Sequence, residues 1–215
     1  MDVERRRIAL NKNDLTRLFL IRHGDTIDEE SKRVFKGTAD IPLSEKGVER
    51  LKKASAFLSR FDFDFIYTSA LSRCIESGKI IAKPHKMETK VAKAFNEIHF
   101  GVWEGRSFDE VQEEYPIEFW KWRKNPDIHT PPEGESLVEA QQRSITNFNK
   151  MVKKHRGQNI VIVSHAGILR LIISAILDLK LSLLFSIAQD YGCINIINVY
   201  KDDLAVIKLL NFTMY

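Results

Sequence analysis

The sequence predicts an α/β fold, a three-layer α/β/α sandwich around a mainly parallel central sheet, for three reasons. Strand-like and helix-like segments alternate along the chain, which is typical of strands joined by crossover helices. Residues 18–21 and 160–163 are apolar at every position, as in parallel strands covered on both faces. No repeat or Pro/Gly/Ser-rich linker divides the 215 residues, so we expect one domain over 17–215 after a basic arm over 1–16.

The first half of the chain is expected to contribute two strands and two helices. After the strand at 18–21, a helix begins at Ser44, because this serine precedes apolar residues that recur at helical spacing. The second strand covers residues 63–67, and the helix that follows it runs to about Ala82.

The second half begins with a small helical cap around residues 100–135. Within it, residues 108–122 are predicted to be helical around Pro116. The later elements are expected to be a helix over 136–155, the strand at 160–163, a helix over 167–177 and strands over 193–200 and 204–210. The last two strands form a hairpin, which adds an antiparallel element to the sheet.

Composition and charge exclude several classes of protein. The chain has 33 Lys+Arg and 29 Asp+Glu, an excess too thin for nucleic-acid binding but suited to a small anionic substrate. Charged residues interrupt the most apolar region, 160–185, and the charged first residues lack the apolar stretch of a signal peptide. Two cysteines argue against a disulfide-dense secreted scaffold. We expect a cytoplasmic monomer or homodimer with no nucleic-acid or membrane partner.

Reactive residues follow the two strongest predicted strands. Arg22 and His23 come directly after the first, and His165 follows the central strand. Arg73 lies a short distance after the strand at 63–67. Because parallel strands end at the same edge of a sheet, we expect two imidazoles and two guanidiniums to meet there, beside helix N-termini that favour anions.

This set of side chains suits a phosphoryl group. Two guanidiniums can hold its oxygens with forked donors, one imidazole can attack phosphorus, and a second, protonated imidazole can stabilise the developing charge. Two histidines without a shell of carboxylates or thiolates make a poor hydrolytic metal site. We therefore expect no metal and no cofactor.

Seven short motifs in order make the chain resemble the histidine phosphatase superfamily, which includes cofactor-dependent phosphoglycerate mutases and many small phosphatases. The resemblance covers residue 18 to about residue 210. The motifs are LIRHG at 20–24, GTADIPL at 37–43, YTSALSR at 67–73, FNEIHFG at 95–101, WEG at 103–105, EGES at 133–136 and VSHAG at 163–167. The resemblance implies a phosphoglycerate mutase-like fold.

The resemblance also implies roles for individual residues. His23 would be the nucleophile that becomes phosphohistidine, and Glu97 the proton donor, with its proton linked to substrate binding. The residues implied to bind the phosphate are Arg22, Arg73 and His165. The residues implied to line the substrate pocket are Gly24, Thr26, Gly37, Thr38 and Ala166. Glu104 is the other carboxylate that could be taken for the acid, and motif position favours Glu97.

One position departs from the family pattern. Family members often have an asparagine six residues after the nucleophilic histidine, where it donates to the phosphate. This chain has Glu29 there. An ionised carboxylate cannot donate and would repel phosphate, so we expect Glu29 to turn outward; otherwise the pocket recognises a different group.

The resemblance favours a metal-independent phosphomonoesterase that acts on a small phosphorylated metabolite. The motifs of the chain are most similar to those of α-ribazole phosphatases and broad-specificity phosphatases. One candidate substrate is therefore α-ribazole 5′-phosphate, and the others are sugar phosphates, phosphoglycerate and phosphoserine. A mutase is the alternative enzyme, but family mutases carry a long insertion where this chain has a short stretch, 105–135. A non-catalytic phosphate-binding module is the alternative from another class.

Overall fold

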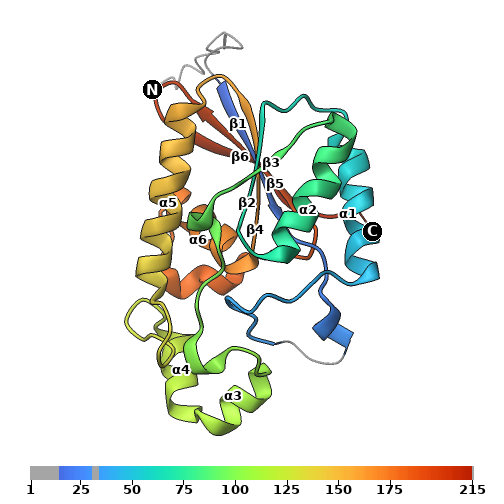
Figure 1. The fold of residues 1–215 in the computed structure, drawn as a ribbon. Helices are drawn as coiled ribbons and strands as arrows, with labels where there is room; N and C mark the ends of the chain where they lie inside the picture. The colour runs from blue at the N-terminus through green and yellow to red at the C-terminus, as the bar shows by residue number, and fades with distance from the viewer. Residues whose placement is uncertain (1–14, 31–33, 215) are drawn as a thin grey trace.

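A computed structural model describes residues 15–30 and 34–214, which form one six-stranded sheet. Along the sheet the strands lie in the order β3-β2-β4-β1-β5-β6 (Figure 1). They are β1 (Leu15–Arg22), β2 (Phe65–Thr68), β3 (Thr89–Val91), β4 (Asn159–Ser164), β5 (Ile194–Tyr200) and β6 (Ala205–Phe212). β3, β2, β4 and β1 are parallel, and β5 and β6 add an antiparallel edge. The mainly parallel sheet is confirmed.

Helices cover both faces of the sheet, as predicted for a three-layer sandwich (Figure 1). They are α1 (Glu45–Leu58) and α2 (Ser72–Ala82) on one face and α5 (Leu137–Lys154) and α6 (Ala166–Ile176) on the other. Alternate residues of β1 enter the two separate cores. Leu18 and Leu20 pack with α5 and α6, whereas Phe19 and Ile21 pack with α1 and α2. Because successive strand residues face opposite sides, burial on both faces requires the continuous apolar run.

Serine caps set the start of two helices that position the site. The Ser44 side chain accepts a hydrogen bond from Gly47 N at the start of α1, as its position predicted. Ser136 and Glu139 form a reciprocal capping box at the start of α5.

The predicted helical cap consists of two short helices, α3 (Phe108–Glu114) and α4 (Pro116–Lys124). Tyr115 leaves helical geometry with φ −128°, because the proline that follows it disfavours helical backbone at this position. The cap has its own small core, formed by Phe35, Trp103, Val111, Phe119 and Trp122. In Figure 1 it extends beyond the end of the sheet at which β2 and β4 finish.

The main differences from the sequence-based expectation lie at the start of β1 and at one edge of the sheet. β1 begins at Leu15, so the last two residues of the predicted arm belong to the sheet, while 1–14 lie outside the described residues. β3 was not predicted. Short 3-10 helices complete the connections at Ile27–Glu30, Lys83–His85, Lys93–Phe95, Gly101–Trp103 and Leu181–Ser186. Within the described ranges, none of the helices has the length and apolar character needed to cross a bilayer.

Candidate active site

Parallel strands bring the two histidines together at one edge of the sheet. Arg22 at the end of β1 lies opposite Ser164 at the end of β4, and His23 N donates to Ser164 O at 3.0 Å. The next residue after β4 is His165. The centres of the His23 and His165 rings are therefore only 5.1 Å apart.

His23 is held as a neutral imidazole with its hydrogen on Nδ1. Its ring is buried, and its Nδ1 lies 2.7 Å from the carbonyl oxygen of Gly24. Because a carbonyl only accepts, Nδ1 carries the hydrogen and Nε2 keeps its lone pair. Burial, followed by the positive charges of Arg22 and Arg73, lowers the pKa of His23 well below its usual value. Nε2 is thus available to attack an electrophile.

His165 is held in the opposite tautomer. Arg73 Nε donates to its Nδ1 at 3.3 Å, so the ring hydrogen is on Nε2, which donates to Ser69 Oγ at 2.7 Å. Burial and the charge of Arg73 lower the pKa of His165 well below its usual value. In the free protein the neutral ring already provides an N–H donor, and its expected protonation around a bound phosphoryl group stays a prediction.

Arg73 is fully buried at the start of α2, and its orientation is fixed by backbone. Its Nη1 donates to Ala39 O at 2.6 Å and its Nη2 to Gly37 O at 2.8 Å. No carboxylate of the described ranges lies within 4.0 Å of it. A buried cation without a counter-ion is costly, and an anionic ligand would offset that cost.

Arg22 lies between the histidines and the segment that precedes β5. Its Nη1 donates to Gln189 O at 2.7 Å, and the centre of the Tyr191 ring lies 3.4 Å from its guanidinium carbon. Its Nε is buried and has no hydrogen-bond partner among the described residues. A buried N–H donor without a partner is rare, and an oxygen of a bound phosphate would satisfy it.

The carboxylate of Glu97 lies at the N-terminus of α6, beside His165. Its Oε2 accepts from Gly167 N at 3.2 Å, and its Oε1 accepts from Ile98 N at 3.1 Å. The positive end of the helix favours an anion at this position. A Cβ on Gly167 would lie 2.5 Å from Glu97 Oε1, so only glycine allows this close approach.

Arg143 of α5 was not predicted as a site residue, and it holds the segment that carries Glu97. The Arg143 guanidinium donates to the carbonyl oxygens of Ala94, Asn96 and Glu97 at 2.8, 2.9 and 3.2 Å. Its opposite edge binds both carboxylate oxygens of Glu135 at 2.6 and 2.8 Å. The EGES motif therefore acts through Arg143 to fix the backbone of the predicted proton donor. An arginine eight residues after a motif glutamate was the only available signal.

Glu104 has a structural position. It accepts from Thr38 N and Thr38 Oγ1 at 2.8 and 2.9 Å, and from Phe100 N at 3.0 Å. A Cβ on Gly37, which has φ +48°, would lie 1.9 Å from its carboxylate. Glu104 thus fastens the loop whose carbonyls bind Arg73 to the base of the cap. The hydroxyl of Thr38 is engaged in this contact.

The other residues predicted to line the pocket occupy two kinds of position. Ala166 is the first residue of α6, directly beside His165. Gly24 packs on α1, where a Cβ would lie 2.7 Å from Gly47 O. Thr26 donates its hydroxyl to Asp28 at 2.6 Å. Gly24 and Thr26 therefore shape the loop after the nucleophile through contacts within the protein.

Two further residues close to the histidines gave no sequence signal. Lys36 is buried, and its Nζ donates to the hydroxyl of Tyr191 at 3.1 Å and lies 3.5 Å from Asp28. The Tyr191 ring is 5.5 Å from the ring of His23, centre to centre. Tyr191 thus joins Lys36 to the cluster, although the two residues lie at opposite ends of the chain.

The expectation for Glu29 concerns a side chain outside the described part of the structure, although its backbone belongs to the 3-10 helix Ile27–Glu30. Within the described ranges, no three His, Cys, Asp or Glu side chains are grouped as a metal site.

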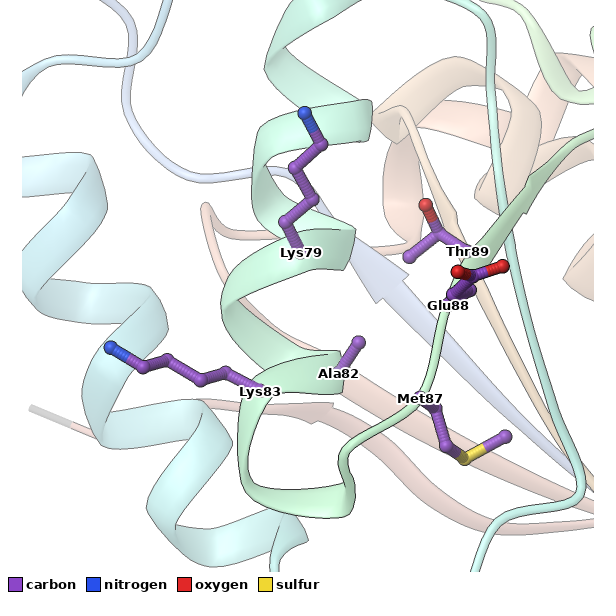
Figure 2. Close-up of a pocket in the computed structure, with 6 residues that line it drawn as sticks. All are labelled: Lys79, Ala82, Lys83, Met87, Glu88 and Thr89. Carbon is purple, nitrogen blue, oxygen red and sulfur yellow. The ribbon is translucent and has the colours of Figure 1, made fainter.

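A separate pocket of about 370 Å³ lies between the C-terminal half of α2 and β3 (Figure 2). It is lined by Lys79, Ala82, Lys83, Met87, Glu88 and Thr89. It lies at the opposite end of α2 from Arg73 and carries no histidine. The histidine cluster is the candidate active site.

Comparison with known proteins decides the family. The model of the histidine phosphatase superfamily (branch 1) matches residues 18–213. The chain belongs to this superfamily. Membership confirms the resemblance, and the chain is a phosphatase of this superfamily, as the sequence predicted.

Curated relatives are similar over nearly the whole chain. Phosphoserine phosphatase 1 of Hydrogenobacter thermophilus is 30% identical over 195 residues, which cover 91% of this chain and 92% of the relative. The adenosylcobalamin/alpha-ribazole phosphatase of Escherichia coli is 26% identical over 195 residues, 91% of this chain and 95% of the relative. Among solved structures, Bacillus stearothermophilus YhfR is 30% identical with a TM-score of 0.86, covering 93% of this chain and 98% of that one. The phosphoglycerate mutase-like fold is thereby confirmed.

Proposed function

We propose that the protein is a metal-independent phosphomonoesterase that forms a phosphohistidine on His23. One observation carries this proposal. The ring of His23 is neutral with a lone pair on Nε2, and it lies beside the guanidiniums of Arg22 and Arg73, which have no carboxylate partner within the described residues. Family membership supports the same reaction class.

The substrate phosphate would lie between Arg22, Arg73 and the two imidazoles. Within the described residues, Arg22 uses only one of its N–H donors, which leaves Nε and the outer edge for phosphate oxygens. Nε2–H of His165 would turn from Ser69 to a phosphate oxygen. The arginines supply the positive charge that metal ions supply in other phosphoryl-transfer enzymes.

In the first step, the Nε2 lone pair of His23 attacks phosphorus in line with the ester oxygen. The N–P bond forms as the bond from phosphorus to the ester oxygen breaks. Glu97, protonated in the substrate complex, transfers its proton to the leaving oxygen. The products of this step are a neutral alcohol, a phosphohistidine and an ionised Glu97.

In the second step, water enters the position that the alcohol has left. Glu97 takes a proton from the water as its oxygen attacks phosphorus, and the N–P bond breaks. Inorganic phosphate leaves, His23 regains its lone pair, and Glu97 is protonated again for the next turnover.

The substrate is a small phosphorylated metabolite. The names of the two curated relatives make phosphoserine and α-ribazole 5′-phosphate the first candidates to assay. A mutase would instead isomerise 3-phosphoglycerate faster than it releases phosphate, and only when 2,3-bisphosphoglycerate is present as primer. A binding module would release no phosphate from any ester.

The nucleophile is tested by His23→Ala, assayed with p-nitrophenyl phosphate at mildly acidic pH. Loss of a covalent nucleophile should lower kcat by about 10⁴-fold or more. Mass spectrometry of rapidly quenched wild-type enzyme should show one added phosphoryl group that the variant lacks. If a well-folded variant kept most of the wild-type turnover, the mechanism would be wrong.

The acid is tested with a matched pair of carboxylates. Glu97→Gln should lower kcat for an alkyl phosphate by about 10²- to 10⁴-fold, which is the usual contribution of general acid catalysis. The loss should be smaller for p-nitrophenyl phosphate, because p-nitrophenolate leaves without full protonation. Glu104→Gln loosens the Thr38 loop but removes no proton donor, so its loss should be the same for both esters.

A further inference from the structure

One short segment, residues 187–191, fixes three cations beside the histidine cluster. Every second residue of the segment binds one of them. Ile187 O accepts from Arg170 Nε at 2.7 Å, Gln189 O accepts from Arg22 Nη1 at 2.7 Å, and Tyr191 Oη accepts from Lys36 Nζ at 3.1 Å. In the proposed mechanism, Arg22 binds the substrate phosphate. The two flanking cations are absent from the mechanism above.

Arg170 and Lys36 differ in how their charges are balanced. Lys36 lies 3.5 Å from the carboxylate of Asp28. Arg170 is only partly exposed, and no carboxylate of residues 15–30 and 34–214 lies within 4.0 Å of its guanidinium. Arg170 is therefore the flanking cation without a counter-ion, a costly arrangement that an anionic ligand would relieve.

The electrostatic surroundings of Arg170 support this conclusion. Partial burial, followed by the charge of nearby Arg22, lowers the pKa of its guanidinium. Glu97 is close enough to offset part of that effect. In the described residues, only Nε of Arg170 makes a hydrogen bond, and both Nη atoms are accessible, so its forked edge can receive a carboxylate or a phosphate.

The place of Arg170 on α6 sets the part of the substrate that it would meet. It lies one helical turn after Ala166 and Gly167, on the same face, and helical side chains lean toward the N-terminus. Gly167 N is the donor to Glu97, which protonates the leaving oxygen in the proposed mechanism. Arg170 thus lies near Glu97, on the side where the proposed mechanism would put the leaving group.

We propose that Arg170 binds a second anionic group on the leaving alcohol, so that the preferred substrates are phosphomonoesters of acidic alcohols, such as phosphorylated hydroxy or amino acids. This inference rests on the proposed phosphomonoesterase function and narrows it. It favours phosphoserine and phosphoglycerate over α-ribazole 5′-phosphate, whose alcohol carries no acidic group.

The experiment compares two esters that differ in one group. 3-Phosphoglycerate carries a carboxylate where glycerol 3-phosphate carries a hydroxymethyl group. The wild type should have a kcat/KM about ten- to a hundredfold higher for 3-phosphoglycerate, the range expected for a charged, forked hydrogen bond. In Arg170→Met the ratio should fall to about one. Arg170→Lys keeps the charge but not the fork, so its ratio should lie between them.

Two controls accompany these variants. Arg156→Gln removes one arginine at the opposite end of β4, where Arg156 donates to Tyr200 O and Asp203, and should keep the wild-type ratio. p-Nitrophenyl phosphate, which has no anionic group besides its phosphate, reports the phosphatase activity separately. Circular dichroism reports folding.

The outcomes separate the two proposals. Turnover of p-nitrophenyl phosphate with a wild-type ratio near or below one would overturn this inference and leave the phosphatase intact. A high ratio that survives in folded Arg170→Met and Arg170→Lys would overturn the role of Arg170. No phosphate release from any ester would overturn the proposed function and this inference with it.

Discussion

The two imidazoles at the sheet edge are held in different tautomers, which the sequence could not indicate. The carbonyl oxygen of Gly24 holds the hydrogen of His23 on Nδ1, whereas Arg73 holds that of His165 on Nε2. One ring therefore presents a lone pair to the cluster, and the other presents a donor. In the proposed mechanism, this division lets a nucleophile and an electrophilic stabiliser of the same residue type work side by side.

Burial of two neutral histidines makes the stability of the fold depend on pH. Their pKa values are well below the unfolded value of about 6.5, so at mildly acidic pH the unfolded chain binds protons that the native protein does not. The contribution of the two histidines to the free energy of unfolding is therefore complete above pH 6.5, and it decreases as the pH falls toward the native pKa values. Each histidine contributes at most about 1.4 kcal/mol per pH unit.

Urea unfolding between pH 7.5 and 5 measures this linkage. Because His23→Asn removes one titrating ring, the decrease in unfolding free energy should be shallower than in the wild type by up to about 1.4 kcal/mol per pH unit. His165→Asn should behave in the same way. Parallel curves for wild type and both variants would show that the two rings titrate in the native state as they do in the unfolded chain.

At the scale of the element, α5 both covers the sheet and supports the site. Its apolar residues pack against β1 and β4. Its Arg143 side chain donates to the backbone carbonyls of Ala94, Asn96 and Glu97. Glu135 neutralises the guanidinium. A rigid helix thereby fixes a loop residue whose carboxylate would meet the leaving oxygen in the proposed mechanism.

Arg143→Met tests this positioning role. The variant should lose about ten- to a hundredfold in kcat for an alkyl phosphate, less than removal of the acid itself, with a much smaller change in KM. The loss should shrink for p-nitrophenyl phosphate, because its leaving group needs little protonation. Lys150→Gln, an exposed substitution on the same helix, is the control. Equal losses on both esters would indicate a general structural defect instead.

Periodicity predicted the long elements well and the short ones poorly. Residues 136–155 repeat their apolar positions often enough to define α5, whereas β3 spans only Thr89–Val91, too short for alternation to register. The single helical stretch predicted around Pro116 is divided into α3 and α4. Arg143 gave little signal beyond its spacing from Glu135, because a charged residue on an amphipathic helix normally faces solvent.

At the scale of the whole molecule, the site depends on long-range contacts made by backbone. Carbonyl oxygens of Gly37 and Ala39 orient Arg73, and that of Gln189 orients Arg22. Backbone carbonyls occur at every residue and leave no mark on the sequence, so motifs could indicate which side chains meet but not what holds them. The same holds for Lys36 and Tyr191, which the fold alone brings together.

These contacts predict that phosphate strengthens the whole fold. A tetrahedral dianion would join residues of β1, α2 and α6, and binding to the native state alone adds about 2.7 kcal/mol at a hundred times Kd. Inorganic phosphate should therefore raise Tm, whereas sodium chloride at equal ionic strength should not. Arg22→Met removes the buried unpartnered Nε and should abolish most of the increase. An undiminished increase in that variant would place the bound phosphate away from the histidine cluster.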